Sequence, residues 1–194
     1  MFDQLHHHIQ SLIEISEEEL NPIDLFFERQ IVPRKKFLLQ EGSVCRFVAF
    51  IERGAVRHFH TKNGDEKTCD ISFEGRWVTD FQSFNTQQPA VINLQALEDS
   101  SFIIIQRDKL NALYAQYPKY ETFGRLVAEQ IAQRATEIAM SLSSDRPEER
   151  FRKLMLSQSD MFQRVPQKYI ANFLGVSPET LSRIRHRILN REKS

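Results

Sequence analysis

The spacing of apolar positions changes along the chain and divides it into stretches with different expected structures. Residues 5–27 repeat apolar side chains at helical spacing, and Ser16 followed by Glu17, Glu18 and Glu19 predicts a capped, acid-rich helix start. Residues 34–106 change to short strand-like runs. Residues 120–143 return to helical spacing, and residues 167–190 form a pattern of two short helices around a glycine.

The strand-like stretch predicts an antiparallel β structure. Gly42, Gly54, Asn63-Gly64-Asp65 and Glu74-Gly75 separate its apolar runs, and the Asn-Gly pair is a strong hairpin signal. Several short strands at this spacing favour a barrel or jelly roll over a parallel sheet. The expected strands are residues 36–39, 47–53, 55–61, 66–73, 92–97 and 101–106.

The long helical stretch predicts a seam between two helices. We expect Asp108 to cap the start of a shorter helix that precedes the long one, and Pro118 to start or kink the long helix itself. Its apolar stripe is longer than one barrel wall can cover, so a partner helix is expected, while packing within the chain explains part of the stripe. The expected interface residues are Phe123, Val127, Ile131, Arg134, Ile138 and Leu142, with Ala135 in the same stripe.

The last pattern has the complete spacing of a helix-turn-helix. Ser177 is a good N-cap, Pro178 occupies the first helical position, and Gly175 allows the left-handed corner between the helices. Small Ala171 lets the helices approach closely. A further helix is expected from Pro147, which places a domain boundary at residues 143–147. The inward residues of the two helices are Ile170, Leu174, Val176, Leu181, Ile184 and Ile188.

The opposite face of the second helix suits the major groove of DNA. Arginine pairs with guanine O6 and N7, and glutamate accepts a hydrogen bond from cytosine N4. A helical hairpin with a merely solvated polar face is the alternative. The outward residues are Glu179, Ser182, Arg183, His186 and Asn190.

Charge is concentrated at the C-terminal end. The chain has 26 basic and 26 acidic side chains, but residues 164–194 contain seven Lys or Arg against two acids, a local charge of +5 that leaves −5 on the remainder. A basic end on an acidic body attracts phosphate where the second helix lies.

Composition excludes several other classes. A length of 194 residues with 41% hydrophobic positions fits a medium domain plus a small one. We find no bilayer-length apolar run and no signal pattern, so a cytoplasmic protein without a membrane partner is expected. Cys45 and Cys69 are too few for a disulfide framework or an iron–sulfur or zinc site and are interpreted as structural thiols. His6, His7 and His8 are interpreted as surface residues without a function.

The order of these elements resembles the Crp/Fnr family of bacterial transcription regulators, particularly short members similar to those of Bacteroidetes. The residues that carry the resemblance are those at 50–57, 96–100, 170–171 and 181–183. It implies an α+β fold: an N-terminal antiparallel β-roll (jelly roll) over residues 1–118 as the effector domain, a long dimerisation helix over 119–146, and a DNA-binding helix-turn-helix over 147–194. The sequence ends at Ser194, so we expect no full β-hairpin wing and a shallower salt dependence.

The resemblance also implies partners and base-reading positions. A homodimer would present its two recognition helices to a palindromic site on double-stranded DNA, with RNA polymerase as a further partner. Glu179 and Arg183 match the family's base-reading residues, and Pro178 stands where many members have a third, usually arginine. The residues expected to contact DNA are Gln167, Lys168, Ser177, Glu179, Thr180, Ser182, Arg183, His186 and Arg187.

The implied effector pocket departs from the cyclic-nucleotide pattern. The ribose-binding Gly-Glu step is Thr79-Asp80 here, and the phosphate-binding Arg-Ser/Thr step is Ala90-Val91. Without that arginine the phosphate charge is uncompensated unless Arg76 or Arg125 replaces it, so cyclic AMP is not expected. No cofactor is expected, and aromatic side chains either line a cavity for another small effector or fill it. The candidate pocket residues are Arg76, Trp77, Thr79, Asp80, Phe81, Val91, Asn93, Ala135 and Thr136.

Two alternatives remain. His58, His60 and Glu66 suggest a cupin-type metal enzyme, although the spacing differs from that family's motif. A dimeric ligand-sensing or adaptor β-roll without DNA binding is the other. The combined patterns favour a regulator that binds DNA and has no catalytic activity.

Overall fold

A computed structural model describes residues 2–158 and 160–191, in which two four-stranded antiparallel sheets pack face to face. One sheet has the order β1 (Glu28–Val32), β8 (Ser100–Gln106), β3 (Phe47–Arg53) and β6 (Trp77–Val78). The other has the order β2 (Phe37–Leu39), β7 (Asn93–Ala96), β4 (Val56–Lys62) and β5 (Asp65–Ser72). This arrangement confirms the predicted jelly-roll class.

Six strands were expected and all six are present, with each end within one residue of its predicted position. The sequence did not predict β1, β6 or the short helix α3 (Phe81–Thr86). Strand β1 exposes four of its five residues at a sheet edge, so it lacks the apolar alternation that marks a strand. Strand β6 has only two residues.

Two turn glycines are held in conformations that other residues rarely adopt. Asn63 and Gly64 both have positive φ, at 54° and 85°, which is the type I′ geometry of a two-residue hairpin between β4 and β5. Gly54 has φ 110°, and a Cβ there would lie 2.8 Å from the Cα of Ser100. The hairpin prediction is confirmed.

Two N-terminal helices cover the outer face of the first sheet. These are α1 (Asp3–Leu12) and α2 (Glu17–Phe26). Ser16 caps α2 as predicted, because its hydroxyl accepts from the Glu19 N–H at 3.3 Å while the Glu19 carboxylate accepts from the Ser16 N–H at 2.8 Å. Strand β8 alternates between two cores: Ile103 and Ile105 pack under the N-terminal helices, and Phe102 and Ile104 pack between the sheets.

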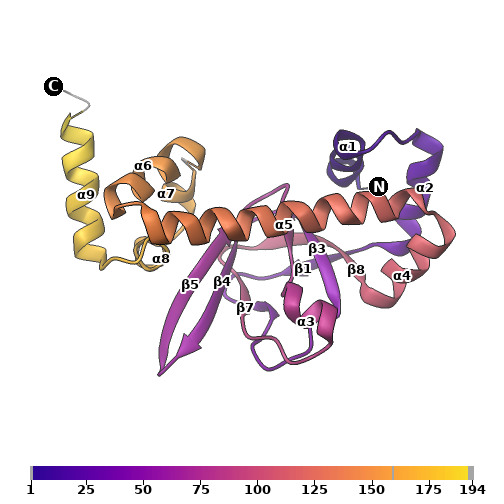
Figure 1. Cartoon of the computed structure of the whole chain (residues 1–194), viewed down its shortest axis with the longest axis horizontal. Coiled ribbons are helices and arrows are strands. Elements are labelled where there is room, and N and C mark those ends of the chain that lie inside the picture. Colours follow the sequence, from indigo (N-terminus) through magenta and orange to yellow (C-terminus); the bar gives the residue numbers. More distant parts are fainter. Residues whose placement is uncertain (1, 159, 192–194) are drawn as a thin grey trace.

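The chain then forms α4 (Arg107–Gln116) and the long α5 (Lys119–Ser144), which runs along the molecule in Figure 1. Pro118 is the N-cap residue of α5, as expected for a helix start. The prediction for Asp108 is wrong: Gln106 is the N-cap position of α4, and Asp108 lies inside the first turn. An acidic side chain in the first turn is still favourable there because it faces the positive end of the helix dipole.

The apolar stripe of α5 divides into two faces. Phe123 and Val127 are only 5% and 6% exposed, because they pack on the N-terminal core with Trp77. The expectation that these two residues meet a second chain is therefore corrected. Ile131 is partly buried against the same core, and Ile138 is half-buried. The apolar side chains left exposed on α5 are Ala132, Ala135, Ala139, Met140 and Leu142.

Four more helices form the C-terminal unit at the opposite end from α1 and α2 (Figure 1). They are α6 (Pro147–Ser157), α7 (Met161–Arg164), α8 (Gln167–Phe173) and α9 (Pro178–Arg191). Their core includes Phe151, Met161 and Leu181, and it continues onto Ala55 and Ile71 of the β-roll. Among the described residues, no helix is long and apolar enough to span a bilayer.

Candidate functional site

Helices α8 and α9 meet at the turn that the sequence predicts. Gly175 has φ 70°, and the Val176 N–H donates to the Ala171 carbonyl at 2.9 Å, which closes the end of α8. Ser177 caps α9, because its hydroxyl accepts from the Thr180 N–H at 3.2 Å. The expected inward side chains are buried, except Val176, which is half-buried. The two helices therefore have a fixed relative orientation.

The outward face of α9 lies at the outer edge of the molecule (Figure 1). Glu179, Ser182, Arg183 and His186 are exposed there, whereas the side chain of Asn190 lies outside the described residues. Nη2 of Arg183 donates to Oγ1 of Thr180 at 3.2 Å, one turn earlier. The pKa of Glu179 lies below its ordinary value, because its own backbone N–H and the Ser177 hydroxyl donate to the carboxylate. At neutral pH this face has a carboxylate acceptor beside a guanidinium donor.

Two of the predicted basic residues are paired within the chain. Arg187 forms an ion pair with Glu148 of α6, because it lies on the side of α9 that faces α6. Arg164 donates to Glu74 at 2.7 Å and also to Glu98, and these bonds raise its pKa. The local excess of positive charge is therefore smaller than the sequence count, and Arg187 differs from Arg183 in its surroundings.

The first helix also presents polar side chains at its start. Gln167 and Lys168 are exposed, and Nζ of Lys168 lies 4.8 Å from the centre of the Tyr169 ring. Thr180 is half-buried and Ser177 is exposed. Eight of the nine residues expected to contact DNA thus lie exposed on α8, α9 or the turn between them, although exposed Arg187 is ion-paired; the ninth, Thr180, is half-buried.

The C-terminal unit is fastened to the β-roll by side chains that the sequence did not single out. The guanidinium of Arg57, on β4, is 1% exposed and lies between the rings of Phe59 and Tyr169, at 4.2 and 4.0 Å from their centres. It also donates to Thr68 at 2.8 Å and to Glu66 at 2.5 Å. Because Tyr169 is far away in the chain, local pattern gives no signal of this contact.

A cavity of about 800 Å³ lies between the β-roll and α5. Four predicted pocket residues line it: Arg76, Trp77, Thr79 and Ala135. The other five predicted pocket residues, Asp80, Phe81, Val91, Asn93 and Thr136, do not line this cavity. Phe81 and Val91 are exposed on the outer surface, Thr136 is exposed on α5, and the Asn93 side chain instead accepts from the Glu41 N–H at 3.0 Å.

Asp80 has a structural role at the end of the strand before α3. Its two carboxylate oxygens accept from the backbone N–H groups of Ser83, at 2.9 Å, and Val91, at 3.1 Å, and the residue is 4% exposed. The N-terminal amide of α3 and the amide of residue 91 are therefore already paired with a negative charge inside the chain. A second anion there would face an uncompensated carboxylate.

The cavity has a polar wall that the sequence did not indicate. Nε2 of His58 lies 3.1 Å from Oγ of Ser72, and Arg134 of α5 pairs with Asp70 of β5 at 2.9 Å. Burial lowers the pKa of His58, Asp70 acts in the opposite direction, and Arg134 lowers it further. The alternation of residues along a strand does not reveal that His58 faces a cavity, so no signal for this role is present in the sequence.

Both cysteines are free in the structure. Cys45 is buried, and burial raises the pKa of the Cys69 thiol to about 11. Cys69 therefore remains protonated at neutral pH, which agrees with a structural role. The interpretation of the histidine run changes for two members, which are half-buried rather than surface residues: the His6 side chain is 15% exposed, and His8 accepts from the indole N–H of Trp77 at 3.1 Å.

The residues of the metal-enzyme alternative are not brought together. Glu66 pairs with Arg57 on the sheet face that carries Phe59, whereas His58 points to Ser72. Within residues 2–158 and 160–191, no three His, Cys, Asp or Glu side chains are grouped closely enough to hold a metal ion.

Comparisons with known proteins agree with this architecture. Residues 29–117 match the family model of the cyclic nucleotide-binding domain. Among solved structures, FixK2 from Bradyrhizobium japonicum has a TM-score of 0.73 at 14% identity, with 86% of each chain covered. The global regulator CLP of Xanthomonas campestris, described as responsive to c-di-GMP, has a TM-score of 0.70 at 15% identity and covers 89% of this chain and 91% of its own.

A further similar structure is a putative Crp/Fnr-family regulator from Eubacterium rectale, with a TM-score of 0.68 at 13% identity and coverage of 92% of this chain and 85% of its own. No curated protein matches the sequence. At these identities the solved structures establish a shared fold.

Proposed function

We propose that this chain, which contains a cyclic nucleotide-binding domain and shares its fold with Crp/Fnr-type transcription regulators, is a homodimeric, sequence-specific DNA-binding regulator. The observation that carries the proposal is the exposed face of α9. Glu179, Ser182 and Arg183 lie together there, at the rim of the molecule, on a helix whose opposite side is buried. This is the geometry in which a recognition helix enters the major groove.

The capped turn supports base reading by α9. Ser177 and Gly175 fix the start of the helix, so its first outward side chains have a defined direction relative to α8. Gln167 and Lys168, at the start of α8, are then available for the phosphate backbone on the same side. Arg187 is assigned to the structural contact with Glu148 rather than to a base.

Small side chains on α5 support the dimer. Ala128, Ala132, Ala135, Ala139 and Leu142 follow one another at intervals of four and three residues, which is the heptad spacing of a two-helix seam. Ala132, Ala135 and Ala139 are exposed, and Leu142 is 48% exposed, on a helix whose other apolar side is buried against the β-roll. A second α5 would bury this stripe, and alanines would let the two helices come close.

The pairing of Asp80 supports an effector other than cyclic AMP. Its carboxylate occupies the amides of Ser83 and Val91. Val91 brings no positive charge, and Arg76 lines the cavity beside α5, whose lining includes neither Asp80 nor Val91. The cavity beside α5 is the place for a small effector, and its wall includes His58, Ser72 and the Asp70–Arg134 pair.

Selection of bound sites from random duplexes, followed by titration at two salt concentrations, tests the proposal. We expect an inverted-repeat site, with half-sites about 10 base pairs apart from centre to centre or a multiple of that spacing. Affinity should fall as salt rises, because lysine and arginine contacts release counterions from the phosphates. Recovery of no common sequence, with equal weak affinity for every duplex, would favour the adaptor alternative.

A further inference from the structure

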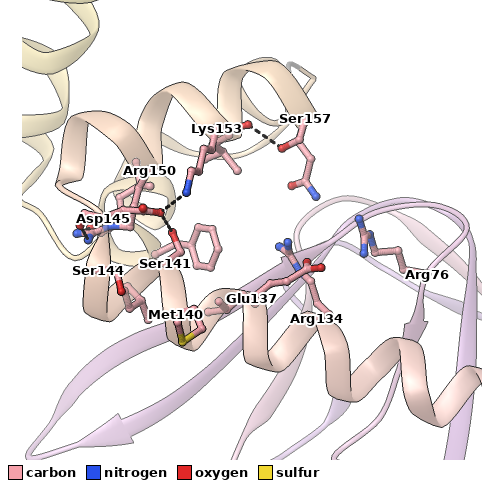
Figure 2. A pocket seen from close by; sticks show the side chains of 16 residues that line it. Arg76, Arg134, Glu137, Met140, Ser141, Ser144, Asp145, Arg150, Lys153 and Ser157 are labelled. Carbon is pink, nitrogen blue, oxygen red and sulfur yellow. Dashed lines mark hydrogen bonds and ion pairs between the residues drawn. The ribbon is translucent and has the colours of Figure 1, made fainter.

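A second cavity, of about 640 Å³, lies where α5 ends and the C-terminal unit begins (Figure 2). Its lining residues come from the β-roll, α5, α6 and α8, which are the parts whose relative orientation would change in a regulator. The turn before β6 contributes Arg76, α5 contributes Arg134 and Ile138, and α6 contributes Lys153. The end of α8 completes the wall with Phe173 and Leu174.

Two buried polar atoms at this cavity have no hydrogen-bond partner among the described residues: Nε of Arg150 and Oε1 of Gln158. The other guanidinium nitrogens of Arg150 are used, because they donate to the carbonyls of Asp145 and Leu174, both at 2.6 Å. Arg150 therefore joins the end of α5 to the end of α8 and keeps one donor unsatisfied. Buried polar groups are rarely left unpaired, so this donor and acceptor are consistent with a bound polar group.

The cavity lining has four cationic side chains, Arg76, Arg134, Arg150 and Lys153, against two carboxylates, Glu137 and Asp145. Arg134 pairs with Asp70 at 2.9 Å, and Lys153 pairs with Asp145 at 2.7 Å. The guanidinium of Arg76 has no hydrogen bond or ion pair within the described ranges, 2–158 and 160–191, and only its backbone carbonyl accepts, from the Ile51 N–H at 2.9 Å. In Figure 2 the side chain of Arg76 extends from the β-roll and that of Arg134 extends from α5, and the two lie on the opposite side of the cavity from α6, which carries Lys153 and Ser157. An anion placed there would compensate Arg76 directly.

Part of the remaining wall is apolar, and Glu137, Ser141, Ser144 and Ser157 are its other polar residues. The apolar part is formed by Ile138 and Leu142 of α5, Leu154 of α6 and Phe173 of α8. A volume of this size lies within the range of small-molecule sites, which combine an apolar wall with a few polar groups. An inorganic anion would leave most of this wall without contacts.

We infer that this interdomain cavity is a binding site for a small organic anion with an apolar body, held by Arg76 through its charge. The inference deepens the proposed function and rests on it in one respect: a ligand here touches the β-roll, α5 and the DNA-binding unit at once, so its binding is coupled to the orientation of α9. Such coupling is reciprocal, and DNA and the anion change each other's affinity by the same factor.

The probe for this site is anilinonaphthalene sulfonate, which joins a sulfonate to aromatic rings and fluoresces when its rings leave water. Titration into the full chain should show saturable binding. Arg76→Gln should weaken that binding about tenfold or more, since a charged hydrogen bond is lost. Arg152→Gln removes the same charge from an exposed position on α6 outside both cavities, and its affinity should equal that of the wild type.

Arg76 borders both cavities, so a second pair of variants assigns the site. Of the two cavities, Lys153 lines only the interdomain cavity and His58 lines only the cavity between the β-roll and α5. Lys153→Gln should weaken the binding of the probe, and His58→Gln should leave the affinity for the probe unchanged. The opposite result, or equal affinity in Arg76→Gln and wild type, would overturn the inference. Thermal melting of each variant confirms that it is folded.

DNA binding is measured separately in the same samples. If the wild type binds no specific DNA but holds the probe through Arg76 and Lys153, the proposed function fails and the site stands. If it binds its selected DNA while neither variant alters probe binding, the site fails and the regulator stands. Inorganic phosphate should not displace the probe at equal concentration; displacement would overturn the requirement for an apolar body.

Discussion

The side-chain carbonyl of Asn172, on α8, accepts a 2.5 Å hydrogen bond from the backbone N–H of Thr68, on β5. The amide nitrogen of the same side chain donates to the Glu66 carbonyl at 3.1 Å. Because β5 is the edge strand of its sheet, its outward backbone groups have no neighbouring strand to pair with. Asn172 supplies both missing partners, and in doing so it attaches the C-terminal unit to the β-roll.

Asn172→Ala should therefore remove both hydrogen bonds that connect α8 to the edge strand β5. The amide hydrogen of Thr68 should exchange about ten- to a hundredfold faster, because the lost hydrogen bond contributes about 1–3 kcal/mol to local stability. Asn172→Asp keeps the acceptor for the Thr68 N–H and should retain most of the protection. Equal exchange rates in the wild type and Asn172→Ala would show that another group protects this amide.

Arg183→Ala should cost about 1–3 kcal/mol of affinity for the selected site and relax the preference at one base pair, because a two-pronged contact to guanine is lost. Competition with single-base variants of the site measures this. Lys168→Ala should instead weaken all duplexes alike and lower the salt slope by about one. If Arg183→Ala reduced affinity for cognate and scrambled duplexes equally, Arg183 would be a phosphate contact.

Ala135→Glu combined with Ala139→Glu should separate the dimer, because two buried carboxylates would face their own copies across the seam. Light scattering should report the monomer mass, and affinity for the palindromic site should fall about a hundredfold or more as the second half-site is lost. Ala115→Glu, an exposed alanine of α4, is the matched control and should remain dimeric. A dimer that survives the double change would refute the alanine seam.

Stability should fall as the solution becomes acidic. The pKa of His58 is lowered in the folded chain by burial, so the unfolded chain binds more protons below the ordinary histidine pKa of about 6.5. The free energy of unfolding should be fully maintained above that pH and decline below it, by up to about 1.4 kcal/mol per pH unit. His8, whose pKa is also lowered by burial, acts in the same direction.

Denaturant titrations at about pH 7 and about pH 5 measure the effect. His58→Gln should show a smaller loss between the two pH values than the wild type, with His8 accounting for the remainder. His7→Gln changes an exposed histidine on the same helix as His8 and should reproduce the wild-type loss. An undiminished loss in His58→Gln would mean that His58 is not the buried neutral group.

Local patterns predicted the elements and the C-terminal helices well. The Asn63-Gly64 turn, the Ser16 cap and the Gly175 corner depend on neighbouring residues only, so their signals are complete in the sequence. Strand β1 was missed because an exposed edge strand has no buried alternation. The face of α5 that meets the β-roll was mistaken for a seam, since Phe123 and Val127 are more apolar than the exposed alanines.

The candidate sites were predictable only in part. The outward face of α9 follows from helical periodicity alone, and Glu179 and Arg183 lie where that periodicity places them. The lining of the cavity between the β-roll and α5 does not follow from periodicity. It depends on how α3 folds between Asp80 and Val91 and on which side of α5 meets β5. The contacts of Arg57 and Arg150 join segments distant in sequence, and only the assembled chain reveals them.

The enclosure of Arg57 between Phe59 and Tyr169 has an evolutionary consequence. A guanidinium between two rings loses one of its two stacking contacts if one ring is lost, and removing the guanidinium leaves the Glu66 carboxylate without its partner. We therefore expect substitutions at positions 57 and 169 to occur together. A lineage that replaces the tyrosine without the arginine must first tolerate a less stable junction between the β-roll and the C-terminal unit.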